Sequence, residues 1–135
     1  MQKPEVRAFK NELRNYAFYV SQVNTIANSI EFLYDRLGGV RGVDPSREPM
    51  HTLPNKDLEY KLRDDITLLE IKKSRLEHKI QEIDMMLDLI ELPIRTAIIS
   101  CYVHGNQVKM VADKFFMSPS GLAKRMDRAI ERAMQ

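Results

Sequence analysis

The stretch LPIRTAIISCYVHGNQVKMVADKFFMSPSGLAKRMDRAIERAMQ, residues 92–135, decides the fold. Its apolar residues recur at three- and four-residue spacing, which is typical of helices that bury one face. Gly105 fits a helix end, and Ser118-Pro119 fit the cap and the first position of a further helix. Asn106 is expected to cap the helix that lies between them. The stretch therefore predicts three short helices, of which the last two form a helix-turn-helix.

The outer face of the last predicted helix carries the residues of chemical interest. Its apolar side chains, Leu122, Met126 and Ile130, are expected to face the core. The residues left to face outward are Ser120, Gly121, Lys124, Arg125 and Arg128. Lysine, arginine and serine are side chains that contact base edges and phosphates, and a helix held by a short turn can enter the DNA major groove. The pattern therefore favours double-stranded DNA as a partner.

The charge is unevenly distributed along the chain. The whole sequence has a net charge of +2. Residues 93–135 hold seven Lys/Arg against three acids, a net charge of +4, whereas residues 1–92 hold fourteen against sixteen, a net charge of −2. A nucleic-acid partner requires positive charge on the element that binds it, and here that charge is concentrated on the predicted helix-turn-helix. A solvated helical surface with several lysines and arginines is the alternative interpretation.

The segment from Val103 to Ile130 resembles the promoter-reading fourth region of sigma factors and the phage regulators built on it. The matching positions are Gly105, Val111-Ala112, Ser118, Leu122, Arg125 and Arg128-Ala129. With the long helical region before it, the chain is similar to phage-encoded late-transcription activators of the ArpU and RinA kind. The resemblance implies DNA contacts by Gln107, Ser118, Ser120, Gly121, Lys124, Arg125 and Arg128, with Lys109 as a further cation beside them. It also implies a phage or prophage origin and allows a contact with RNA polymerase.

Two long apolar seams precede this segment. The first consists of Val6, Phe9, Leu13, Tyr16, Val20, Val23, Ala27, Ile30, Tyr34 and Leu37, and Gly38-Gly39 is expected to end its helix. The second consists of Leu62, Ile66, Leu69, Leu76, Ile80, Ile83, Leu87 and Ile90, with Lys73 as its only break. We therefore predict an all-α chain with a long antiparallel helical hairpin, coiled-coil-like, in residues 1–91, a loop at 38–54, and a helix-turn-helix domain in residues 92–135.

The first helix carries more apolar residues than one seam needs, at Phe18, Tyr19, Ile26, Phe32 and Leu33. Such a face is expected to be buried against a second subunit, which predicts a homodimer. It could instead pack on the C-terminal domain of its own chain. The same seams also permit the long helices to pair either within one chain or between two chains.

The sequence lacks the residue patterns that several classes of function require. The three histidines, His51, His78 and His104, have no cysteine or acid at metal-ligand spacing, and Gly38–Gly42 lacks the ending of a phosphate-binding loop. The single cysteine, Cys101, lies in an apolar stripe and is expected to be a core residue. We therefore expect no enzyme activity, no cofactor and no metal. Without a signal peptide or an apolar run that could span a bilayer, the expected location is the cytoplasm of a bacterial host cell.

Three functions fit this sequence. The first is a sequence-specific transcription regulator that docks Ser118–Arg128 in a major groove. The second is a small terminase-like subunit that binds phage DNA for packaging, since such a protein also joins a helix-turn-helix to helical oligomerisation elements. The third is a protein-interaction module whose helix-turn-helix has lost DNA binding, because Met110 and Gly121 depart from the residues usual in the sigma-like pattern.

Overall fold

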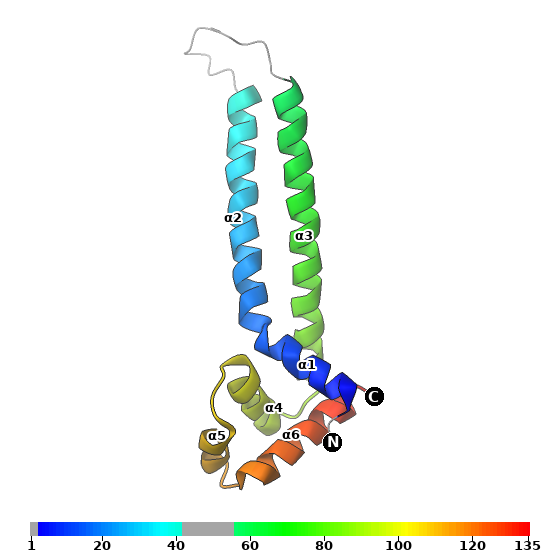
Figure 1. Ribbon diagram of the computed structural model, residues 1–135, viewed down its shortest axis with the longest axis vertical. Helices are drawn as coiled ribbons and strands as arrows, with labels where there is room; N and C mark the ends of the chain where they lie inside the picture. Colours follow the sequence, from blue (N-terminus) through cyan, green and yellow to red (C-terminus); the bar gives the residue numbers. More distant parts are fainter. Residues whose placement is uncertain (1–2, 42–55) are drawn as a thin grey trace. The chain divides into compact units, whose positions relative to one another are not determined.

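The computed structural model describes residues 3–41 and 56–135, and every element in these ranges is helical (Figure 1). The elements are α1 (Pro4–Arg14), α2 (Tyr16–Arg41), α3 (Lys56–Asp88), α4 (Leu92–Ile98), the π-helix η1 (Ile99–Val103), α5 (Val108–Lys114) and α6 (Pro119–Ala133). The predicted all-α class is confirmed. Most of the predicted loop, residues 42–54, lies outside the described residues. No helix among those described is both long and apolar enough to span a membrane.

The chain divides into two compact units. One comprises the residues up to Tyr19 together with His78–Gln135, and the other comprises Val20–Glu77. The sequence-based division placed its boundary at residue 91 instead. The structure groups α1 and the end of α3 with the C-terminal helices because their apolar side chains are buried in that unit.

The first unit buries side chains from each of its helices. In it, α1 packs against η1 and α6, α4 packs against α6, and α5 packs against α6 and η1. The buried apolar residues of this unit are Val6, Phe9, Leu13, Tyr19, Ile83, Leu87, Ile90, Ala97, Ile98, Cys101, Val111, Ala112, Leu122, Met126 and Ile130. The expectation that Cys101 is a core residue is confirmed.

The first predicted helix differs from the structure in its interior and at its C-terminal end. It is interrupted at Asn15, which caps α1 with φ −92° and ψ −1° and donates its backbone N–H to the carbonyls of Asn11 and Glu12. These backbone angles lie at the edge of the right-handed helical region, where residues that end a helical turn are found. At the C-terminal end, Gly38-Gly39 does not stop the helix, because α2 continues to Arg41. Both glycines lie in open surroundings, and a Cβ added at either position would have no neighbouring atom within 4 Å.

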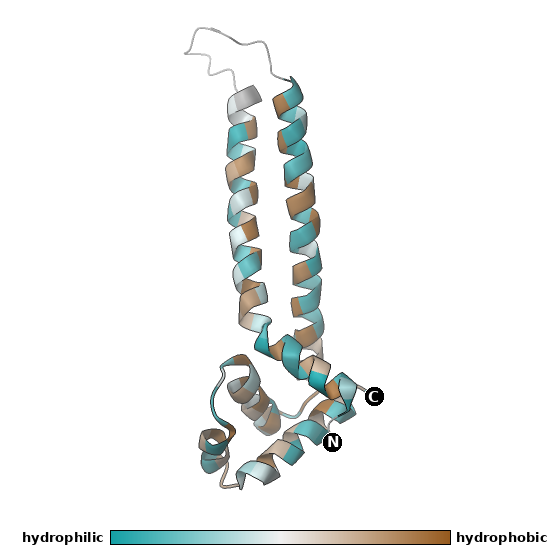
Figure 2. Cartoon of the chain, viewed as in Figure 1, coloured by the Kyte–Doolittle hydropathy of each residue, from teal (hydrophilic) through white to brown (hydrophobic). Residues whose placement is uncertain are grey.

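The second unit is a pair of helices. The parts of α2 and α3 within it lie side by side and run in opposite directions (Figure 1). Its buried cluster consists of Leu37, Leu62 and Ile66, against which Ile30, Leu33 and Leu58 pack. The Tyr34 hydroxyl donates to Glu70 Oε1 at 3.1 Å and adds a polar link between the helices. Apolar residues, brown in Figure 2, alternate with hydrophilic ones along both helices.

The seam of α2 lies one residue earlier than predicted over part of its length. Val20 and Tyr34 were assigned to it, but their side chains are exposed. Ile26 and Leu33 take the inward positions, and Ile26 is only 5% exposed. Because the residues at 26 and 27 and at 33 and 34 are all apolar or aromatic, the spacing alone cannot decide between the two registers. Packing selects the aliphatic Ile26 and Leu33.

Candidate nucleic-acid interface

The last helix, α6, is firmly positioned by its sequence. Ser118 is its N-cap, and its Oγ accepts a hydrogen bond from the Gly121 N–H at 3.0 Å. Pro119 follows at the first position, where a missing N–H costs nothing. Leu122, Met126 and Ile130 recur at four-residue spacing and are fully buried. The predicted cap and inward face of this helix are confirmed, and the opposite face is free to meet a partner.

The preceding helix, α5, begins one residue later than expected. Its N-cap is Gln107, not Asn106, and no side chain bonds to its first turn. Asn106 is used elsewhere: its Nδ2 donates to Ser100 Oγ at 2.9 Å, and its backbone N–H donates to the Ser100 carbonyl. Val111 and Ala112 of α5 are buried, which seats α5 against α6 and η1.

Most residues predicted to contact DNA are exposed. They are Gln107 and Lys109 around the start of α5, and Ser118, Ser120, Lys124, Arg125 and Arg128 on the cap and body of α6. Gly121 is partly buried, and a Cβ at its position would lie 2.9 Å from Ser118 Oγ. Close approach of the capping hydroxyl therefore gives this glycine a structural role, which was not predicted from the sequence.

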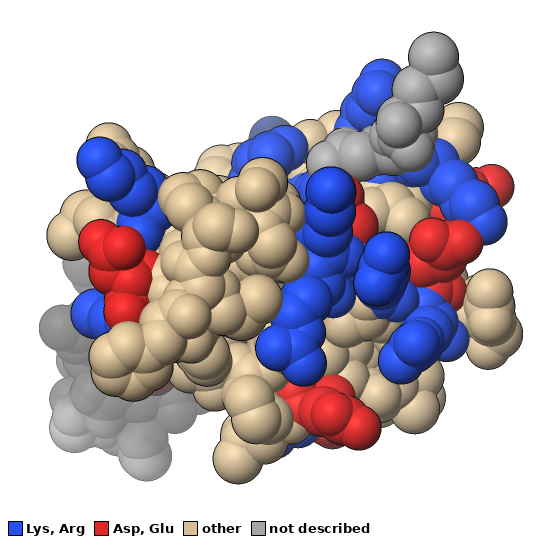
Figure 3. Space-filling view, turned by 90° about the horizontal axis from the view of Figure 1, so that it is seen from below, with Lys and Arg blue, Asp and Glu red and all other residues tan. Residues whose placement is uncertain are grey.

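The charged residues of α6 fall into two groups. Its two acids are paired with lysines that lie in or just before α1: Lys10 Nζ lies 2.5 Å from Asp127 Oδ1, and Lys3 pairs with Glu131. Its cations Lys124, Arg125, Arg128 and Arg132 have no acidic partner within ion-pair distance in the described part of the chain. Figure 3 shows Lys and Arg side chains gathered beside one another at the end of the molecule viewed there. The pairing leaves an uncompensated positive face on α6.

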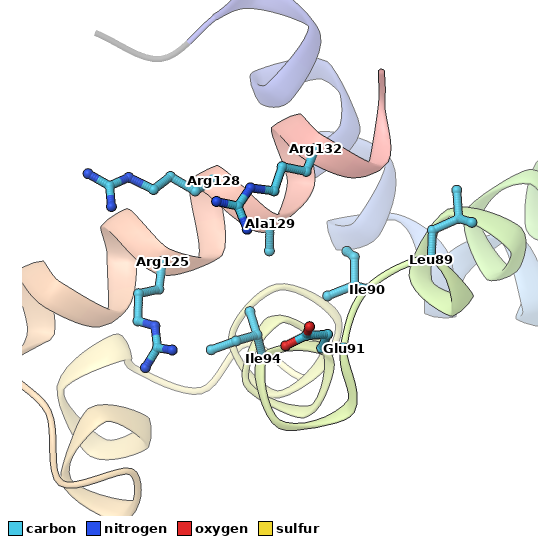
Figure 4. Close-up of a pocket in the computed structure, with 8 residues that line it drawn as sticks. All are labelled: Leu89, Ile90, Glu91, Ile94, Arg125, Arg128, Ala129 and Arg132. Atoms are coloured by element: carbon cyan, nitrogen blue, oxygen red, sulfur yellow. The ribbon is translucent and has the colours of Figure 1, made fainter.

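A hollow of about 340 Å³ adjoins this face (Figure 4). Arg125, Arg128 and Arg132 line it from α6, while Leu89, Ile90, Glu91 and Ile94 line it from α4 and the segment before it. Arginine guanidinium groups bind phosphate or carboxylate oxygens, often through two parallel hydrogen bonds. In Figure 4 the three guanidinium groups point in different directions, and the Glu91 carboxylate lines the same hollow. The hollow therefore offers an anionic group separate arginine contacts at the side of α6 and one carboxylate that would repel it.

Two residues that contribute to the arrangement of α6 were not predicted from the sequence, one lining the hollow and one buried beside the helix. Arg132 lies near the end of α6 but lines the same hollow as Arg125 and Arg128, and their i, i+3 and i+7 spacing was a usable signal. Lys10 resembles a surface residue of a long amphipathic helix, yet it is only 3% exposed. The burial of Lys10 depends on residues of α6, which lie far away in the sequence, so the residues near Lys10 in the sequence do not predict it.

Other chemistry has little support in the described residues. Burial raises the pKa of the Cys101 thiol, which disfavours the reactive thiolate. No group of three or more His, Cys, Asp or Glu side chains in residues 3–41 and 56–135 is arranged to hold a metal ion. The exposed cations of α5 and α6 are thus the most distinctive chemical feature of the first unit.

Comparison with known proteins returned no match to a family model, to a curated protein or to a solved structure.

Proposed function

We propose that this protein is a sequence-specific DNA-binding transcription regulator of phage or prophage type. In this proposal α5 and α6 act as a helix-turn-helix, and the first turns of α6 enter the major groove of double-stranded DNA. The other exposed cations contact phosphates on either side. The sigma-like character, the phage origin and a contact with RNA polymerase rest on the resemblance of residues 103–130 alone.

One observation carries the proposal: the acids of α6 are neutralised within the chain and its cations are not. Asp127 and Glu131 would repel phosphates, but lysines at the N-terminal end of the chain pair with both. Lys124, Arg125 and Arg128 remain exposed on the same helix. Neutralising phosphates releases counterions, which supplies most of the affinity for DNA that does not depend on sequence. A surface arranged in this way favours a polyanion over a neutral partner.

The proposed arrangement also includes a homodimer formed through the long helices. Large apolar side chains of the second unit are exposed in the single chain: Phe32, Tyr34, Tyr60, Leu68 and Ile71. Exposed apolar residues spread over both helices of a pair support burial against a further helix pair. A two-fold dimer would present two copies of α6 to two half-sites about one helical turn of DNA apart.

Selection from a pool of random duplex DNA at moderate salt tests the proposal. We expect enrichment of a defined sequence, and a palindrome would add the two-fold dimer. The matched variant replaces Lys124 and Arg125 with alanine. Both side chains are exposed, so the variant should keep its helical content and lose the enrichment. If the natural chain enriches no defined sequence, or if the variant enriches the same sequence equally well, the docking of α6 in the major groove is contradicted.

The mass of the protein in solution separates the remaining candidates. A ring of many subunits that binds DNA would favour the terminase-like packaging role, whereas a monomer or dimer would favour regulation. A chain that binds no DNA even at low salt would favour the protein-interaction module, in which the exposed Met110 would contact a protein.

A further inference from the structure

The turn between α5 and α6 holds an aromatic residue in a glycine position. The Met117 N–H donates to the Ala112 carbonyl at 3.0 Å, and the Phe116 N–H donates to the Asp113 carbonyl at 3.2 Å. These two bonds define a Schellman cap, in which the residue corresponding to Phe116 takes the left-handed conformation. Phe116 does so, with φ +56°. Glycine is the usual residue there because a Cβ is crowded in that conformation.

The cost of the left-handed backbone at Phe116 is not offset by burial of its side chain. The side chain of Phe116 is 96% exposed, the highest value among the exposed large hydrophobic residues of the described chain. The left-handed backbone conformation favours glycine at this position, and exposure to solvent favours a polar side chain. A residue that is unfavourable on both counts within the turn is best explained by a contact made in a complex.

The surroundings of Phe116 indicate which partner it meets. Two residues later Ser118 caps α6, and Lys109, Lys114 and Lys124 are exposed on the two helices that the turn joins. The ring thus lies at the entry of the helix that, in the proposed function, reaches the base edges. A phenyl ring offers no hydrogen bond to a phosphate or to a polar base edge. In the major groove the apolar group on the base edges is the 5-methyl group of thymine.

We propose, on the basis of the proposed function, that Phe116 is a specificity-determining residue whose ring packs against a thymine 5-methyl group in the bound DNA. The contact lies beside the bases that the first turn of α6 reads. It makes the turn part of the recognition surface and adds a thymine to each half-site.

The test uses the full chain and the duplex enriched from the random pool, with each thymine replaced in turn by deoxyuridine. Deoxyuridine keeps the pairing edge and removes only the methyl group. We expect one position in each half-site to lose affinity by about fourfold, the worth of one buried methyl group. Phe116→Ala should weaken binding to the thymine duplex by at least as much, and it should abolish the sensitivity to deoxyuridine at that position.

Two variants keep the result specific. Phe116→Gly removes the ring and suits the left-handed backbone, so it should raise the melting temperature by about 4 °C or more while it too loses the sensitivity to deoxyuridine. Met85→Ala removes an exposed apolar side chain of α3, outside the helix-turn-helix. It should keep both the affinity and the deoxyuridine sensitivity of the natural chain.

The outcomes separate this proposal from the proposed function. If a defined duplex is enriched but no thymine position is sensitive, or if Phe116→Ala stays as sensitive as the natural chain, the thymine contact is overturned and DNA binding by α6 stands. If the pool yields no enriched duplex, the proposed function fails and the contact fails with it.

Discussion

The ammonium group of Lys10 lies 2.5 Å from Asp127 Oδ1, and this ion pair joins α1 to α6. The lysine side chain is almost wholly buried, and its ammonium also lies 5.3 Å from the centre of the Tyr102 ring. Asp127 Oδ1 is buried and has no hydrogen bond of good geometry, so the lysine is what compensates its charge. A buried charge without its partner is costly. The pair therefore adds a polar contact between α1 and α6 to the apolar packing of α1.

Removal of one partner should destabilise the fold more than removal of both. Lys10→Ala should lower the free energy of unfolding by about 3 kcal/mol, the lower end for a broken buried pair, because the Asp127 side chain is one-third exposed. The double variant Lys10→Met, Asp127→Leu should recover most of that loss, since apolar residues of similar size replace buried pairs well. Urea denaturation of the three proteins measures both values. A double variant that loses as much stability as Lys10→Ala, or more, would contradict the prediction.

The Ser118 cap and Gly121 should show a coupling of the opposite kind. Gly121→Ala should stabilise α6 by up to about 1 kcal/mol through its higher helix propensity. The added Cβ would clash with Ser118 Oγ and weaken the cap, which contributes about 1 kcal/mol to stability. We expect the substitution to be nearly neutral in the natural chain. In a Ser118→Gly background the clash is absent, and Gly121→Ala should then stabilise by about 0.5–1 kcal/mol. Equal effects in both backgrounds, measured by thermal unfolding, would contradict the clash.

The α2 seam can be tested at two positions of the helix. Ile26→Ala should lower the free energy of unfolding by about 2 kcal/mol or more, because its side chain is buried. Val20→Ala removes a side chain that is 37% exposed and should cost less than about 0.5 kcal/mol in the monomer. Urea denaturation at low protein concentration is the measurement. A larger loss for Val20 than for Ile26 would restore the register predicted from the spacing.

Local signals in the sequence were sufficient for the class of the fold and for the last helix. Ser118 and Pro119 start α6 as predicted, and Leu122, Met126 and Ile130 are its buried face. These features depend on neighbours within one or two turns, which a sequence displays directly. For the same reason the exposed residues of α6 could be identified as the candidate site.

Features that depend on distant contacts could not be predicted in this way. The burial of Lys10 requires Asp127, and the register of α2 requires the residues of α3 against which it packs. The interruption at Asn15 lies within a continuous apolar spacing that gives no sign of it. In each case a local pattern permits two structures, and tertiary packing selects one.

Burial of Cys101 should affect both its reactivity and the pH dependence of stability. Because burial raises the pKa of this thiol, native protein at pH 8 should react with a thiol reagent far more slowly than protein unfolded in urea. The folded state binds the proton more tightly, so stability falls as the pH rises above the ordinary pKa of a cysteine. Cys101→Ala should remove part of this fall, as measured by thermal unfolding from pH 7 to 10. Rapid labelling of the native chain would show that the thiol is accessible.

The salt dependence of DNA binding tests whether Arg132 belongs to the interface. In the proposed function each cation that meets a phosphate adds about 1 to the slope of log affinity against log salt concentration. Arg132 shares the hollow with Arg125 and Arg128, so Arg132→Ala should reduce the slope by about 1, as Arg128→Ala should. Arg36→Ala, which removes an exposed arginine of the second unit, is the matched control and should leave the slope unchanged. If Arg132→Ala behaves like Arg36→Ala while Arg128→Ala lowers the slope, the DNA contact ends before the last turn of α6, and the hollow faces another partner.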